Sequence, residues 1–178
     1  WSVVAGALHL VITLRMAIDS APLAQSTWSE ALIYVALFGF IGSFIFGISA
    51  RAIRGFLLLK PMHETINIVA LWFVQIGLTI LVIGRFADLD QNVASLGLIL
   101  SAVGAALYVY ALRVLEPSSG PIRRFAIGYE RYGWLVRTAY AWLVLGCVML
   151  VVSALDSAGV TDVMPPEGSL PVMHVFTL

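Results

Sequence analysis

Residues 66–83, INIVALWFVQIGLTILVI, contain no charged side chain and decide the class of the fold. At 1.5 Å per residue, a helix of this length spans about 27 Å, close to the hydrocarbon thickness of a bilayer. The whole chain is 61% hydrophobic and only 11% charged, which is far from the composition of soluble domains. We predict an all-α polytopic membrane helix bundle with spans at residues 1–17, 31–50, 66–83, 93–112 and 134–155, and the start of a sixth at 171–178.

Both ends of the chain lie in apolar sequence, since it begins at Trp1 and stops at Leu178, shortly after His174. We therefore expect one transmembrane domain over residues 1–178 that is part of a longer chain. Its partners are then the lipid bilayer and other transmembrane helices or subunits.

Charged residues are sorted between alternate loops. The segments at 51–65 and 113–133, with the residues that flank them, hold eight basic and three acidic side chains, while the other side holds two basic and seven acidic ones. Lys and Arg near helix ends are retained on the cytoplasmic side of a membrane, so we predict that both basic loops are cytoplasmic. The basic aromatic stretch 123–134 suits anionic headgroups, and we expect no nucleic-acid partner.

Small residues recur at helical spacing in two of the predicted spans. The two stripes are Gly39, Ser43 and Gly47, and Gly97, Ser101 and Ala105. Such stripes favour close helix packing, although a flat cofactor can use the same surface.

Few polar side chains fall inside the predicted spans. Tyr108, Tyr110 and Tyr140 need one hydrogen-bond partner each, and the single cysteine, Cys147, is interpreted as a small buried apolar residue. One cysteine can form neither an intrachain disulfide nor a thiolate metal site.

The three histidines are expected at three depths. His9 falls near the midplane, His174 opens the sixth helix from the outer side, and His63 lies in a basic loop as a solvated or headgroup-level residue. His9 and His174 differ in depth by roughly 8–12 Å on helical rise, so they pair poorly across one haem. If haem binds, at least one axial ligand comes from another part of the protein or another chain.

Three segments carry a resemblance to a known family. They are GFIGSFIFGISAR at 39–51, followed by GFL at 55–57; RTAYAWL at 137–143; and HVFTL at 174–178. In this order they resemble the NnrS family, haem- and copper-associated bacterial membrane proteins of the nitric oxide response. That family is similar in architecture to the catalytic subunit of haem–copper oxidases. Its amino-terminal motif, two close histidines before Glu-Met, is not visible here.

The resemblance implies a short set of site residues. His174 matches the helix-opening histidine and becomes the candidate axial or copper ligand; the alternative is an interfacial histidine at a helix start. Arg51 matches the arginine that closes the Gly-rich helix, where it can pair with a haem propionate or act as a positive-inside anchor. His9 has no counterpart in the family and is either a cofactor ligand or hydrogen-bonded to a neighbouring helix. The implied cofactors are haem and copper.

Two functions remain open at this point. The resemblance implies a haem-associated protein of the bacterial cytoplasmic (inner) membrane, linked to nitric oxide response or respiratory electron transfer. The alternative is a non-catalytic structural or anchor subunit of a larger membrane complex. A transporter is disfavoured, because the first five spans hold no proline and no inverted repeat is visible. Whether the protein is an enzyme is left open.

Overall fold

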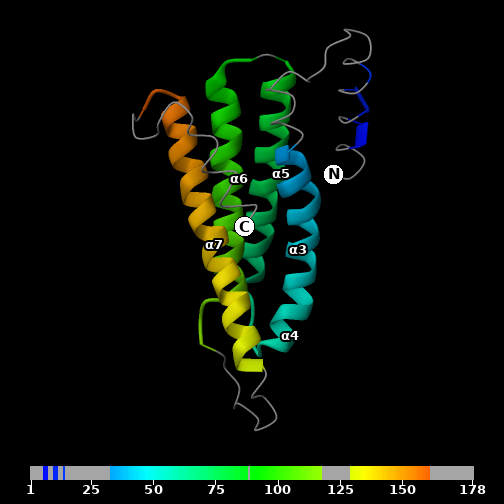
Figure 1. Ribbon diagram of the computed structural model, residues 1–178, viewed down its shortest axis with the longest axis vertical. Helices are drawn as coiled ribbons and strands as arrows, with labels where there is room; N and C mark the ends of the chain where they lie inside the picture. The colour runs from blue at the N-terminus through cyan, green and yellow to red at the C-terminus, as the bar shows by residue number, and fades with distance from the viewer. Residues whose placement is uncertain are drawn as a thin grey trace.

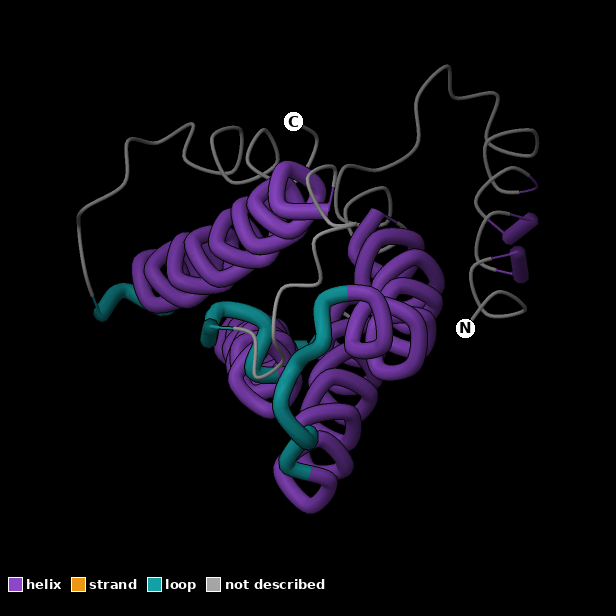
Figure 2. The backbone as a smooth tube through the Cα atoms, turned by 90° about the horizontal axis from the view of Figure 1, so that it is seen from below, coloured by secondary structure: helices purple, strands orange, loops and turns teal. Residues whose placement is uncertain are grey.

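The computed structural model describes residues 6–7, 10–11, 14, 33–87, 89–117 and 129–160. The elements named in this part of the chain are all helical (Figures 1 and 2). In chain order they are η1 (Val35–Gly42), α3 (Ser43–Ile48), η2 (Ser49–Ile53), α4 (Arg54–Phe56), α5 (Glu64–Phe86), α6 (Gln91–Leu112) and α7 (Tyr129–Ser157). The first four follow one another without a break and form one helix, called the 35–56 span below. Within it η1 and η2 are π-helical.

Four helices are long and apolar enough to cross a membrane: Val35–Phe56, Glu64–Arg85, Gln91–Leu112 and Tyr132–Ser157. They correspond to the four central spans predicted from the sequence. The predicted spans at 1–17 and 171–178 lie outside the described residues, apart from five residues of the first. The described part of the chain therefore supports four spans and not a count of five or six.

The helix ends differ from the predicted loop boundaries. The predicted loop 51–65 begins too early, because Arg51 and Arg54 are still helical and the helix ends at Phe56. Cationic side chains suit the last turns of a helix, where they face the negative end of its dipole. The predicted loop 113–133 also ends too late, since α7 begins at Tyr129.

Successive spans run in opposite directions through the bundle (Figure 1). α4, the start of α5, the end of α6 and the start of α7 lie at one end, so the described residues of the two predicted basic loops share that end. The 87–90 connection joins α5 to α6 at the other end. α6 packs against both α5 and α7, while α5 also contacts η1.

The bundle is filled by tight side-chain packing and is apolar on its outside. Tyr108, Leu78 and Leu150 are among the largest fully buried side chains. Large apolar side chains such as Phe44, which is 64% exposed, and Trp72, which is 62% exposed, lie on the surface. Exposed apolar surface over the length of spanning helices is what lipid contact requires.

Candidate functional site

Glycines bring the backbones of α5 and α6 into direct contact. A Cβ atom on Gly97 would lie 2.6 Å from the Leu81 amide nitrogen, and one on Gly104 would lie 2.7 Å from the Val74 amide nitrogen. A Cβ on Gly77 would lie 2.6 Å from the backbone nitrogen of Ser101. The predicted packing role of the Gly97, Ser101 and Ala105 stripe is confirmed. This face is covered by α5, so it is closed to a flat cofactor.

The second predicted stripe does not form one packing face. Gly39 is buried, whereas Gly47 is exposed and a Cβ placed there would meet nothing within 4 Å. Gly39 lies in η1 and Gly47 in α3, and a π-helical turn holds more residues than an α-helical one. The change of helix type therefore rotates the two glycines onto different faces.

The 35–56 span is instead held by polar contacts from all three neighbouring helices. Gln75 Nε2 on α5 donates to Ser43 Oγ at 3.3 Å, the Tyr108 hydroxyl on α6 donates to the Phe46 carbonyl oxygen at 2.5 Å, and the Tyr140 hydroxyl on α7 donates to Ser49 Oγ. These six residues are called the polar cluster below. Ser43 and Phe46 lie on α3, and Ser49 caps α3 and is the first residue of η2. π-helical segments occur frequently at functional sites, which makes this stretch the candidate site of the described bundle.

Both tyrosines of the polar cluster are buried. Tyr108 is 1% exposed, and its ring stacks on that of Phe46 with 4.2 Å between centroids. Tyr140 and its acceptor Ser49 are buried as well. The prediction of one hydrogen-bond partner each is confirmed for Tyr108 and Tyr140, whereas Tyr110 is 63% exposed and stacks on His63. Sequence reasoning missed the acceptors, because neither Ser49 nor a backbone carbonyl stands out in a Gly-rich apolar helix.

The polar groups of the polar cluster carry no charge. Hydroxyl and amide groups can fix the register of one helix against three others, and they can accept or donate a hydrogen bond to a ligand. Within the described ranges no group of His, Cys, Asp or Glu side chains could hold a metal ion. Cys147 is buried, as predicted.

A second group of polar contacts lies at the end of the bundle where α6 stops. Glu116 accepts from Lys60 Nζ at 2.9 Å and from Arg113 Nε at 2.8 Å. Hydrogen bonds from Arg113 and then Lys60 lower the pKa of the Glu116 carboxyl to about 2, and the same carboxylate raises the pKa of Arg113. Arg137 on α7 donates to the carbonyl oxygens of Val114 and Glu116 at 3.3 and 3.2 Å. These contacts tie the 57–63 connection, the turn after α6 and the start of α7 together.

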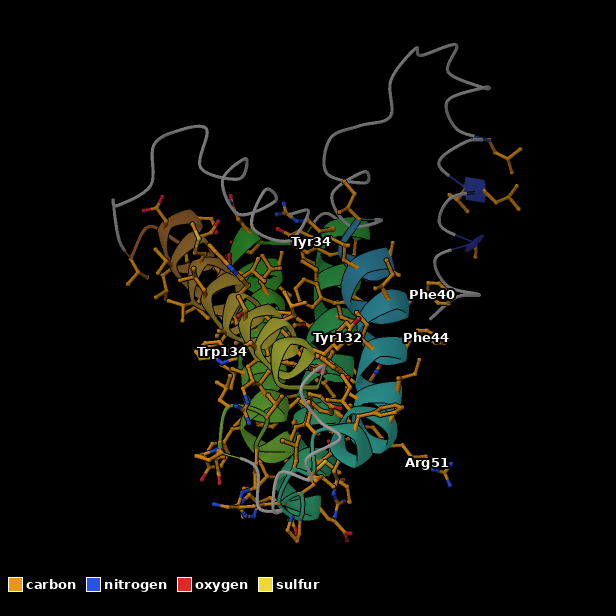
Figure 3. All side chains as sticks on the ribbon, turned by 60° about the horizontal axis from the view of Figure 1, so that its bottom comes forward. Tyr34, Phe40, Phe44, Arg51, Tyr132 and Trp134 are labelled. Atoms are coloured by element: carbon orange, nitrogen blue, oxygen red, sulfur yellow. The ribbon has the colours of Figure 1, made fainter. Side chains whose placement is uncertain are left out.

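The residues proposed from the sequence as ligands are not gathered into one site. His9 and His174 lie outside the described residues. Arg51 is exposed and points away from the bundle (Figure 3). His63, the only histidine in the described part of the chain, is exposed and stacks on Tyr110 with 6.0 Å between ring centroids.

The described residues therefore do not by themselves fit a haem or a copper ion. Their single histidine lies at the end of the bundle, just before α5 begins, and the helix interfaces are filled by glycine contacts and the polar cluster. An axial ligand within these ranges would have to be His63. Any other histidine ligand lies outside the described residues or in another chain.

Comparison of the chain with family models, with curated proteins and with solved structures finds no match in any of the three.

Proposed function

We propose that the chain is a haem-associated membrane protein similar to the NnrS family, linked to nitric oxide response or respiratory electron transfer. In this proposal it resides in the bacterial cytoplasmic membrane with its basic end in the cytoplasm. One observation supports it most. Two of the three segments that carry the resemblance touch each other, because Tyr140 of residues 137–143 donates to Ser49 of residues 39–51. Segments that resemble one family and also pack together behave as one structural unit.

The proposal assigns the cofactor to the outside of the four described spans. The α5–α6 interface is closed by backbone contacts at its glycines. His174 is the proposed haem ligand, and because His9 is expected at another depth, the second ligand would come from another part of the protein or from another chain. Arg51 is exposed at the end of its helix, where its planar guanidinium can take a carboxylate such as a propionate with two hydrogen bonds. Haem iron, if bound, would supply diatomic-gas binding or electron transfer, and the histidine ligand would tune its reactivity.

The visible absorption spectrum of the purified full chain tests this proposal. We expect a Soret band in membranes and in detergent, which shifts when nitric oxide is added. His174→Ala should abolish or displace the band, whereas His63→Ala, at the exposed end of the bundle, should leave it unchanged. A full-length preparation without a Soret band would refute the haem assignment. A band that survives His174→Ala would remove His174 from it.

A second candidate is a non-catalytic anchor subunit of a larger membrane complex. It is favoured by the outward apolar face of α7, where Trp142 is 55% and Val148 is 54% exposed, and by a polar cluster that is engaged in joining helices. This candidate predicts a larger assembly on gentle extraction and no haem within reach of any histidine of this chain. The same spectrum, recorded together with the mass of the extracted particle, separates the two candidates.

A further inference from the structure

Among the residues whose side chains the structure describes, five arginines and lysines at the α4 end of the bundle fall into two groups. Lys60 and Arg113 are neutralised by Glu116, at 2.9 and 2.8 Å. Arg137 donates to two carbonyl oxygens of the turn after α6. These three side chains are engaged in holding the turns of the bundle together.

Arg51 and Arg54 form the other group. They occupy the last turns of the 35–56 span, and no carboxylate pairs with either of them among the described residues. Arg51 lies in η2 and Arg54 is the first residue of α4, so both positive charges fall within the last two turns of the span. Arg51 is exposed and Arg54 is half-buried.

An exposed apolar face leads directly to Arg51 along the same helix. Phe40, Phe44 and Arg51 extend from one side of the span (Figure 3). Phe40 is 52%, Phe44 64% and Ile48 45% exposed, and Gly47 between them carries no side chain. Beyond the arginines, Phe56 is 66% exposed. Along this span, apolar surface at membrane depth is followed by two cations at the helix end. This is the order of acyl chains and phosphate in a lipid.

We propose that Arg51 and Arg54, with the face formed by Phe44 and Ile48, bind an anionic phospholipid of the leaflet at this end. The guanidinium groups hydrogen-bond to the headgroup phosphate, and the acyl chains lie along Phe44 and Ile48. Charge complementarity supports this assignment, because neither arginine is paired with a carboxylate among the described residues and both lie at the end of a spanning helix, where anionic headgroups attract cations. The proposal does not rest on the haem assignment, and it places a phospholipid phosphate on Arg51 instead of a haem propionate.

Native mass spectrometry of the full chain, extracted from mixed phosphatidylglycerol and phosphatidylcholine vesicles, tests the site. Each cation near the surface contributes roughly five-fold in affinity for anionic lipid, so Arg51→Gln with Arg54→Gln should lower the preference for phosphatidylglycerol by roughly twenty-five-fold. The matched control is Lys60→Gln, which removes one positive charge at the same end from a residue already paired with Glu116. It should change the preference by less than about two-fold.

Retention of the preference when both arginines are replaced by lysine would show that the glutamine variant lost charge and not its fold. Three results would overturn the proposal. The first is an unchanged preference in the double glutamine variant. The second is an equal loss in Lys60→Gln, which would indicate a diffuse charge effect. The third is a change in the Soret band of Arg51→Gln without any change in bound lipid, which would make a haem propionate the occupant.

Discussion

The α5–α6 interface and the attachment of the 35–56 span join helices by different means. At the first, glycines let two backbones touch, so that an added Cβ atom would clash with the backbone of the neighbouring helix. At the second, three neighbouring helices each donate one hydrogen bond to α3 or to Ser49, the first residue of η2. Inside a bilayer, a side chain added where two backbones touch forces the helices apart and disrupts their whole interface. A single interhelical hydrogen bond, by contrast, contributes on average about 0.6 kcal/mol. The comparison predicts a rigid helix pair and a more weakly attached third helix.

The largest effect is expected from Gly97→Leu. The new Cβ would lie 2.6 Å from the Leu81 amide nitrogen, so α5 and α6 must separate, at a cost of about 3 kcal/mol in the free energy of unfolding. Cys147 is buried and is the only cysteine of the chain, so its reaction with a fluorogenic maleimide during heating reports unfolding. Gly47→Leu is the matched control and should shift the free energy by about 0.5 kcal/mol or less, since nothing lies within 4 Å of the added Cβ. Equal shifts in the two variants would contradict the steric account of the interface.

A smaller effect is expected from the tyrosines of the polar cluster. Tyr140→Phe removes the donor to Ser49, and Tyr108→Phe removes the donor to the Phe46 carbonyl. Each should cost about 1 kcal/mol, within the range measured for hydrogen bonds between membrane helices. Tyr110→Phe, on an exposed side chain, serves as the control for losing a tyrosine hydroxyl.

A double-mutant cycle sharpens this prediction. Tyr140→Phe and Ser49→Ala should be non-additive by about 0.5–1.5 kcal/mol, because both remove the same bond. Strict additivity would show that the two hydroxyls do not interact in the folded protein.

The smallest effect concerns the basic end and depends on pH. The pKa of Glu116 is lowered from 4.5 to about 2, first by Arg113 and then by Lys60. A carboxyl whose pKa is depressed in the folded state stabilises it above the unfolded pKa, and that contribution is lost as the pH falls from about 4.5 to about 2. Glu116→Gln should therefore remove part of the acid-induced loss of thermal stability, followed by tryptophan fluorescence. The effect is small, because the side chain of Glu116 is partly exposed and its ion pairs are screened by solvent. Identical acid profiles for the two proteins would refute this role of Glu116.

Long charge-free stretches made the four central spans predictable, as residues 66–83 illustrate, and the small residues around Ser101 correctly indicated close packing. The end of the first of these spans was less predictable, because Arg51 and Arg54 were interpreted as loop residues although cations are favourable in the last turns of a helix. The contacts of Ser49 could not be predicted, since spacing along one helix does not tell which neighbouring helix faces it. The π-helical turns made these contacts still harder to predict, because they rotate every later residue to a different face of the helix than α-helical spacing implies. The roles of His9 and His174 as cofactor ligands remain predictions.

Hydrogen–deuterium exchange of the full chain in lipid nanodiscs tests most directly the claim that one helix pair is rigid and the 35–56 span is attached by hydrogen bonds. Amides of α5 and α6 should exchange slowest, and Tyr108→Phe with Tyr140→Phe should speed exchange in residues 35–56 while leaving residues 64–112 unchanged. Uniform acceleration across all four spans, or no acceleration in residues 35–56, would contradict the account.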